Sequence, residues 1–212
     1  SEFVYTYQST YGDALAIYGN IAQSDYEGEG AKDESPADKI ARSPGSFAEG
    51  YEAGGLPIQG NRQLELAGMA VFRREKMVAT LNTKDTQAFA ILHNEIKSTH
   101  IIFPDMLEPE RYYVSFDARQ QQPVTVKTRI AEDGHAVIEL SVVLNALIGI
   151  SQNPDANYLG DPTLREELYA HCSGIMQQRC EELIQKLQTE YESDPLQLGR
   201  HVAKNFSTVE QW

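Results

Sequence analysis

The most constraining feature of this chain is a succession of three segments in which apolar and polar residues alternate one by one. They cover residues 112–118, 124–130 and 135–144. Because successive side chains of a strand point to opposite faces, this alternation predicts antiparallel strands with one buried and one solvated face. Asp133 and Gly134 between the last two segments are typical of a tight turn, so we expect these two strands to form a hairpin.

A long helix is predicted after the strands. Apolar residues recur there with a period near 3.6, namely Leu168, Cys172, Ile175, Met176, Leu183, Leu187 and Tyr191. Either Asp161 or Thr163 could cap its start, and Thr163 with Glu166 would make a capping box. Asp194 and Pro195 are expected to end it. A helix of about 30 residues is about 45 Å long, enough to cover the apolar face of the sheet.

The segment before these strands also predicts regular structure. Residues 63–72 and 77–81 indicate a hairpin, and residues 99–103 indicate a further strand. Thr83 is expected to cap a helix that runs to about Ile96. The predicted fold class is therefore α+β, a mostly antiparallel sheet packed by a short helix and a long C-terminal helix.

The first part of the chain differs in composition. Residues 1–60 hold 10 acidic and 3 basic side chains, and residues 24–46 are poor in large apolar residues, which is typical of a solvated linker. Residues 11–22 predict a short helix. We expect residues 1–55 to be the remnant of a preceding (middle) domain with an acidic, glycine-rich linker, and residues 56–212 to form the C-terminal domain.

The charge balance excludes some classes of partner. A formal net charge of −13 repels nucleic-acid phosphates and anionic lipid headgroups, so no nucleic-acid partner is expected. The chain has no run of 18 apolar residues, so no membrane-spanning helix is predicted. No signal peptide is expected within it either.

Residues with a recognisable catalytic spacing are missing from the sequence. A serine nucleophile elbow needs the pattern G-x-S-x-G, which does not occur, and the five histidines are scattered. Cys172 and Cys180 lie about 12 Å apart on the predicted helix, too far for a disulfide, and are interpreted as buried apolar residues. We therefore expect no catalytic residue, metal or cofactor, which favours an interaction or sensing role over an enzyme.

Two motifs near the ends of the regular region carry a resemblance. The first is the hairpin pattern L-x-G-x-A-V-F followed by K-x-V-x-x-L, formed by Leu66, Gly68, Ala70, Val71, Phe72, Lys76, Val78 and Leu81. The second is D-P-L-Q-L-G, from Asp194 to Gly199 after the long helix, followed by the terminal Trp212. Over residues 56–212 the chain resembles the Ger(x)C spore germination lipoproteins, the C subunits of nutrient germinant receptors.

The resemblance implies a function without catalysis. Members of this family are lipid-anchored to the outer face of the spore inner membrane, assemble with integral membrane A and B subunits, and are needed for the response to nutrients. The lipid anchor would lie outside this chain. This function predicts apolar patches on the surface and no enclosed polar pocket. The candidate motif or structural residues are Gly68, Phe72, Lys76, Asp194, Gly199 and Trp212.

Each of these residues has a structural interpretation beside the functional one. Gly68 predicts a bulge or a close approach of another group, and Lys76 predicts a solvated charge. Asp194 is expected to cap or end local backbone structure, with Gly199 at a positive φ. Trp212 is expected to anchor in its own core or in a partner.

Two other functions stay open at the level of the sequence. An extracytoplasmic module that binds a small ligand or the cell wall would need a concave pocket with convergent polar groups. A hydrolase with an unrecognised site would need a buried nucleophile beside a histidine.

Overall fold

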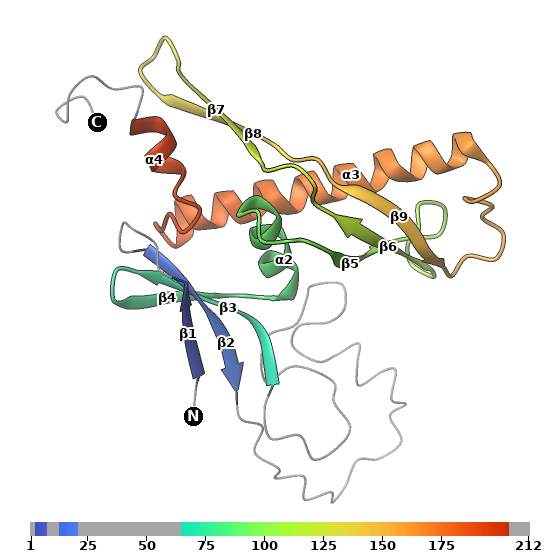
Figure 1. The fold of residues 1–212 in the computed structure, drawn as a ribbon, viewed down its shortest axis with the longest axis horizontal. Helices are drawn as coiled ribbons and strands as arrows, with labels where there is room; N and C mark the ends of the chain where they lie inside the picture. Colours follow the sequence, from blue (N-terminus) through green and yellow to red (C-terminus); the bar gives the residue numbers. More distant parts are fainter. Residues whose placement is uncertain (1–2, 8–12, 21–64, 204–212) are drawn as a thin grey trace, which may run out of the picture. The chain divides into compact units, whose positions relative to one another are not determined.

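The computed structural model describes residues 3–7, 13–20 and 65–203 of the chain (Figure 1). The chain divides into two compact units, which are described separately. The first unit comprises Ser1–Gln87 and Leu183–Gln197, and the second comprises Ala88–Glu182 and Leu198–Trp212. The domain boundary predicted after residue 55 lies outside the described residues and stays a prediction.

The first unit contains a four-stranded antiparallel sheet in the order β1-β2-β3-β4. Its strands are β1 (Phe3–Tyr7), β2 (Asp13–Asn20), β3 (Glu65–Arg73) and β4 (Lys76–Leu81). The predicted β3–β4 hairpin is confirmed. Its register pairs Met69 with Leu81 and Arg73 with Lys76, and Arg74 in the turn has a φ of +56°.

The helix predicted over residues 11–22 is wrong, because its residues 13–20 form strand β2. Strand β2 pairs with β1 on one side and with β3 on the other, so its backbone groups are bonded to distant parts of the chain. A short apolar run such as residues 14–18 fits a strand and a helix about equally well. The long-range pairing, which the local pattern does not contain, decides the outcome.

Helix α2 (Thr83–Leu92) is shorter than predicted, and its N-cap lies one residue before the predicted one. The backbone N–H of Asp85 donates to Asn82 Oδ1 at 2.8 Å, so Asn82 rather than Thr83 is the N-cap. The helix ends before Ile96 because Asn94 has a φ of +63° and the N–H of Glu95 donates to the carbonyl of Ala90 at 2.9 Å. This pattern is a common way of closing a helix.

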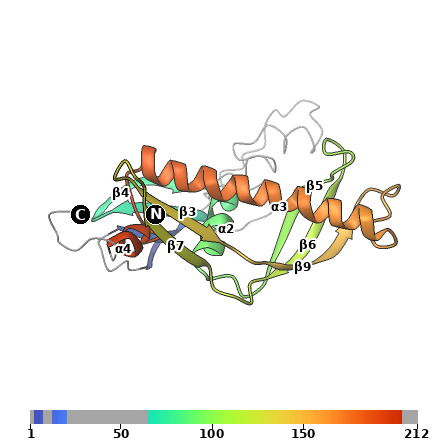
Figure 2. The same cartoon turned by 90° about the horizontal axis from the view of Figure 1, so that it is seen from above.

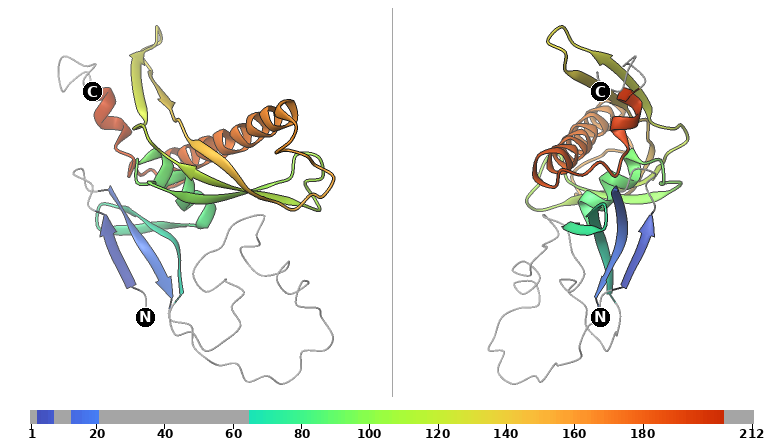
Figure 3. Two further views of the ribbon diagram at one scale, coloured as in Figure 1. Left: turned by 45° about the vertical axis from the view of Figure 1, so that its right-hand side comes forward. Right: turned by 90° about the vertical axis from the view of Figure 1, so that its left-hand side faces the viewer.

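The second unit is built around a three-stranded antiparallel sheet in the order β5-β6-β9. Its strands are β5 (Thr99–Pro104), β6 (Tyr113–Arg119) and β9 (Asn145–Ser151). Between β6 and β9 the chain forms the hairpin β7 (Thr125–Ile130) and β8 (Ala136–Ser141), which projects beyond the three-stranded sheet (Figure 3). The predicted β7–β8 hairpin is confirmed, with Gly134 at a φ of +86°. Strand β9 was not predicted.

Helix α3 (Pro162–Gln185) lies along one face of this sheet (Figure 2). Of the two candidate caps, Asp161 is the one used: its Oδ1 accepts from the N–H groups of Thr163 at 2.9 Å and Leu164 at 3.2 Å. The helix continues as a π-helical turn, η1 (Lys186–Glu190), in which the N–H of Tyr191 donates to the carbonyl of Lys186 at 3.0 Å. It therefore ends before the predicted stop at Asp194 and Pro195.

The core of the second unit lies between α3 and the sheet. It contains Ile91, Ile101, Phe103, Val114, Phe116, Ala118, Tyr158, Leu168, Cys172 and Met176. The inward residues of β6, namely Val114, Phe116 and Ala118, are those that the alternation assigns to one face. Helix α4 (Leu198–Ala203) contacts β7 and β8. The predicted α+β class, antiparallel sheets with a short and a long helix, is confirmed.

No helix within residues 3–7, 13–20 and 65–203 is both long and apolar enough to cross a membrane.

Candidate functional site

The face of the β5-β6-β9 sheet opposite α3 carries an exposed group of side chains, which we call the outer sheet face. It consists of His100 and Ile102 from β5, Ser115 and Asp117 from β6, and Leu147 and Ile150 from β9. The strand register places Ile102, Ser115 and Ile150 in one row across the sheet. The next row is formed by His100, Asp117 and Leu147, so three large apolar side chains share this face.

These three apolar side chains are exposed to solvent. Leu147 is 73% exposed, Ile150 68% and Ile102 41%. Single exposed apolar residues are ordinary, but several on one sheet face are typical of surfaces that another molecule covers. The outer sheet face therefore has the composition of a protein-interaction surface.

A β-bulge in β9 aims Ile150 outward. Ser115 pairs with Ile150 and Phe116 pairs with Ile148, which leaves Gly149 as the extra residue. The Ser115 hydroxyl holds the bulge, since Oγ accepts from the Ile150 N–H at 3.0 Å and donates to the Ile150 carbonyl at 3.4 Å. In a strand without a bulge, Leu147 and Ile150 would point to opposite faces, because they are three residues apart and side chains alternate along a strand.

The polar residues of the outer sheet face compensate one another. His100 Nδ1 and Asp117 Oδ1 are in direct contact on neighbouring strands. Ser115 is engaged with the backbone of β9, as described above. The apolar side chains are thus flanked by polar groups that already have partners, which lowers the cost of removing water from this face.

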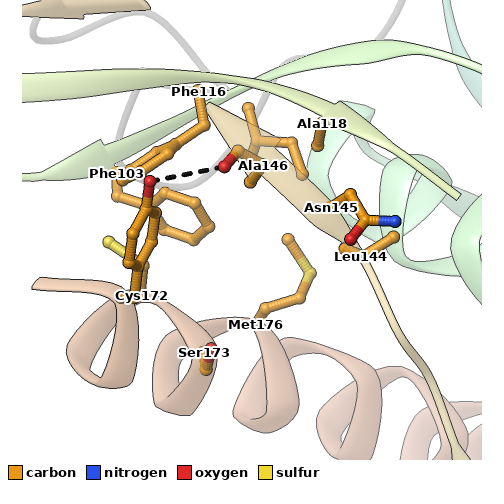
Figure 4. A pocket seen from close by; sticks show the side chains of 11 residues that line it. Phe103, Phe116, Ala118, Leu144, Asn145, Ala146, Cys172, Ser173 and Met176 are labelled. Atoms are coloured by element: carbon orange, nitrogen blue, oxygen red, sulfur yellow. Dashed lines mark hydrogen bonds between the residues drawn. The ribbon is translucent and has the colours of Figure 1, made fainter. Parts of the chain in front are cut away.

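On the α3 side of the same sheet lies a cavity of about 350 Å³, which we call the inner cavity (Figure 4). Its lining consists of Ile101, Phe103, Phe116, Ala118, Leu144, Asn145, Ala146, Tyr169, Cys172, Ser173 and Met176. Figure 4 shows Cys172, Ser173 and Met176 on the helix and Phe116 and Ala118 on the strands across from them. The Tyr169 hydroxyl donates to the carbonyl of Ala146 at 3.4 Å across this space.

A buried carboxylate fixes the loop beside the sheet. Asp105 is 0% exposed, and its Oδ1 accepts from Asn153 Nδ2 and from the N–H groups of Leu107 and Glu108, each at 3.0 Å. Its Oδ2 accepts from the Tyr158 hydroxyl at 2.7 Å. All its partners come from this chain, so we interpret the group as structural.

These contacts shift two pKa values in opposite directions. Burial alone would raise the pKa of Asp105, but the hydrogen bonds from Asn153, Glu108, Tyr158 and Leu107 together outweigh it and lower that pKa. Burial, together with the hydrogen bond to the ionised Asp105, raises the pKa of Tyr158. The pair is therefore ionised carboxylate and neutral phenol at neutral pH.

The two cysteines are unsuited to act as nucleophiles. Cys172 is buried and Cys180 is partly buried, and burial is the main reason that their pKa values rise to about 12 and about 11. A protonated thiol is a poor nucleophile and a poor metal ligand. Within the part of the chain that the structure describes, no three His, Cys, Asp or Glu side chains are grouped to hold a metal ion.

Gly68, the first of the sequence-selected residues, lies on β3 with a φ of +79°. A Cβ atom at this position would lie 2.1 Å from the backbone carbonyl oxygen of Leu81, on the neighbouring strand β4. Only a residue without a side chain fits this approach. The role of Gly68 toward a partner stays a prediction.

The two residues just before the closing motif contact the β3–β4 hairpin in the first unit. The Ser193 hydroxyl donates to the carbonyl of the half-buried Phe72 at 3.0 Å, and Arg73 forms an ion pair with Glu192. The neighbouring Asp194 accepts from the N–H of Gln197 at 3.0 Å through its carbonyl and so closes a turn. Ser193 was missed by the sequence reasoning, because no local pattern reveals a partner 121 residues away.

Lys76 and Gly199 make neither of these two contacts. Lys76 is exposed at the start of β4. Gly199 belongs to the second unit, and the positive φ predicted for it is wrong: it lies in α4, and the left-handed residue is Gln197, with a φ of +57°. The turn thus closes two residues earlier than the motif suggests. Trp212 lies outside the described residues.

Comparison with known proteins agrees with this architecture. The sequence matches the family described as spore germination B3/GerAC like, C-terminal, over residues 67–212. No curated protein matches the chain. The fold is similar to the crystal structure of the GerBC protein, with a TM-score of 0.54 and 14% sequence identity, over 97% of this chain and 88% of that one.

The family match covers more than half of the chain and includes most of the hairpin motif and all of the closing motif. It confirms the resemblance to the C subunits of germinant receptors that these motifs indicate. This chain belongs to the spore germination B3/GerAC-like family.

Proposed function

We propose that this chain is the extracytoplasmic part of a non-catalytic lipoprotein subunit of a spore nutrient germinant receptor. In this proposal the full-length protein is anchored by lipid to the outer face of the spore inner membrane. The domain binds the integral membrane A and B subunits and holds them in the arrangement that responds to nutrients. It needs no catalytic residue, metal or cofactor for this.

The observation that carries the proposal is the outer sheet face. Ile102, Leu147 and Ile150 expose large apolar surfaces on one side of a sheet whose other side is already covered by α3. An apolar surface of this kind gains free energy when a partner removes it from water. The bulge at Gly149 adds Ile150 to this surface. Several exposed apolar side chains on one sheet face are typical of a surface that a partner covers.

The test replaces the two most exposed apolar side chains of this face. Leu147→Thr with Ile150→Thr keeps strand-forming residues but removes most of the apolar surface. The matched control is Leu159→Thr, because Leu159 is 75% exposed and lies outside the sheet. Each variant would be placed in the full-length protein, in spores whose nutrient response requires this gene.

We expect the double variant to fold normally and to lose co-purification with the A and B subunits. Release of dipicolinic acid under nutrients should slow by about tenfold or more, as expected for loss of an interface centre. Release under a receptor-independent trigger should not change. Normal nutrient response and normal co-purification of the double variant would contradict the proposal, as would an equal defect in Leu159→Thr.

A second candidate function is an extracytoplasmic module that binds a small ligand or the cell wall. The inner cavity favours the small-ligand form of this function, because its volume of about 350 Å³ is that of a ligand site. Its lining is mostly apolar, whereas a saccharide of the cell wall would need many convergent hydrogen-bonding groups. The cavity therefore favours an apolar ligand over a cell-wall polymer.

A further inference from the structure

The inner cavity is large enough to hold a small molecule. Its volume is about 350 Å³, within the range of roughly 300–1,000 Å³ that ligand sites span. An apolar cavity of about 150 Å³ in a protein core is known to accept benzene. The inner cavity would therefore accept a molecule of about two fused rings, or an aliphatic chain of similar volume.

The lining of the cavity selects against charge. None of its eleven residues is acidic or basic, and most are hydrocarbon or aromatic side chains. An ionised ligand would lose its hydration here, and no residue of the lining would offer it an opposite charge. Cys172 adds no charge, since burial raises the pKa of its thiol to about 12.

One polar group inside the cavity is poorly satisfied. The Tyr169 hydroxyl lies 3.4 Å from the carbonyl oxygen of Ala146, whereas hydroxyl donors ordinarily approach an oxygen to about 2.7–2.8 Å. A ligand hydroxyl placed beside this pair, within hydrogen-bond distance of both oxygens, could accept from Tyr169 and donate to the Ala146 carbonyl. Asn145 and Ser173 are exposed residues of the lining, so they mark where the cavity opens to solvent.

We infer that the inner cavity is a binding site for a small, neutral, mostly hydrocarbon molecule with one hydrogen-bonding group. The aromatic rings of Phe103 and Phe116, which meet edge to face at 5.8 Å, form one wall for its apolar part. Tyr169 and the Ala146 carbonyl bind its polar group. The site lies on the opposite side of the sheet from the outer sheet face, so it does not depend on the docking role proposed above.

The probe for this inference is 1-naphthol, a neutral two-ring molecule with one hydroxyl. Titration of the 212-residue chain by calorimetry should show one saturable site with a Kd of about 100 µM or tighter. The matched ligand is 1-naphthoate, which keeps the rings but carries a negative charge at neutral pH. It should bind at least about tenfold more weakly.

Two tryptophan substitutions locate the site. Ser173→Trp fills the cavity from its exposed rim and should weaken binding of 1-naphthol by about tenfold or more. Gly174→Trp is the control, because nothing lies within 4 Å of a Cβ built at Gly174. It should leave the Kd unchanged.

An NMR measurement on the unmodified chain locates the bound ligand without any substitution. The chain has four methionines, so their methyl resonances can be assigned individually by NMR. Binding of 1-naphthol should shift the methyl resonance of Met176 and leave that of Met77 on β4 unchanged.

Three outcomes with the unmodified chain would overturn the inference. They are the absence of saturable binding by the folded chain up to about 1 mM 1-naphthol, equal binding of 1-naphthoate, and shifts that spare the Met176 methyl group. Binding that survives Ser173→Trp in a folded variant would also place the ligand elsewhere.

Discussion

Gly68 and Gly134 both have a positive φ but differ in their surroundings. Both have φ values near +80°, at +79° and +86°. An alanine at either position therefore carries a conformational cost of about 1–2 kcal/mol. Gly68→Ala would in addition drive its Cβ to 2.1 Å from the Leu81 carbonyl, whereas nothing lies within 4 Å at Gly134.

We predict that Gly68→Ala lowers the free energy of unfolding by at least about 3 kcal/mol, and Gly134→Ala by about 1–2 kcal/mol. Urea denaturation followed by circular dichroism measures both values. Equal losses in the two variants would mean that β3 and β4 do not approach closely at Gly68.

The buried Asp105 carboxylate makes the free energy of unfolding depend on pH in the acidic range. Its pKa is lower in the folded chain than its ordinary value of 3.8, so the unfolded chain binds the proton more readily. The resulting stabilisation is complete above about pH 4 and is lost as the pH falls through the folded-state pKa. We predict that the free energy of unfolding declines below pH 4, and that Asp105→Asn flattens this decline.

The measurement is a series of urea denaturation curves between about pH 2 and pH 7. Glu167→Gln is the control, since Glu167 is an exposed residue of α3. It should keep the slope of the parent chain. An identical acid slope in Asp105→Asn would show that the hydrogen bonds to this carboxylate do not favour its ionised form.

At the scale of the element, the start of α3 gives a matched pair of variants. Asp161 caps the helix through two backbone N–H groups, whereas Thr163 was an equal candidate in the sequence. We predict that Asp161→Ala costs about 1 kcal/mol of stability, and that Thr163→Ala changes it by less than about 0.5 kcal/mol. Thermal unfolding followed by circular dichroism gives the comparison, and the reverse order would make Thr163 the cap.

Strands and helices whose apolar residues recur at a constant, uninterrupted spacing could be predicted from the sequence. The strands β6, β7 and β8 follow from simple alternation, and α3 follows from its apolar stripe. Strand β9 was missed because the bulge at Gly149 interrupts the alternation. A glycine within an apolar run is a known sign of a bulge, so this signal was present. Strand β2 was misassigned because its partners, β1 and β3, lie outside its local pattern.

The candidate sites were less accessible to sequence reasoning. The outer sheet face depends on which residues of β5, β6 and β9 lie side by side, and the register is set by long-range pairing. The inner cavity depends on how completely side chains of α3 fill the space above the sheet, which composition does not determine. The hairpin and closing motifs identified the family, but none of their residues belongs to either site.

At the scale of the whole molecule, charge governs encounters with the membrane surface. A net charge of −13 gives no electrostatic attraction to anionic lipid. We predict that the chain does not sediment with vesicles of anionic phosphatidylserine and neutral phosphatidylcholine at low salt. Vesicles of phosphatidylcholine alone are the control. Salt-sensitive binding to the anionic vesicles alone would contradict the prediction and would reveal a basic surface.

The close approach of the Leu81 carbonyl to Gly68 also bears on how relatives of this chain are found. A sequence search with the glycine motif selects proteins that share the backbone of this hairpin. The reason is that the hairpin requires a glycine at this position whatever the protein binds. Paralogues that have exchanged partners would still be retrieved. Their divergence should be sought at positions 102, 147 and 150, where the backbone leaves the choice of side chain open.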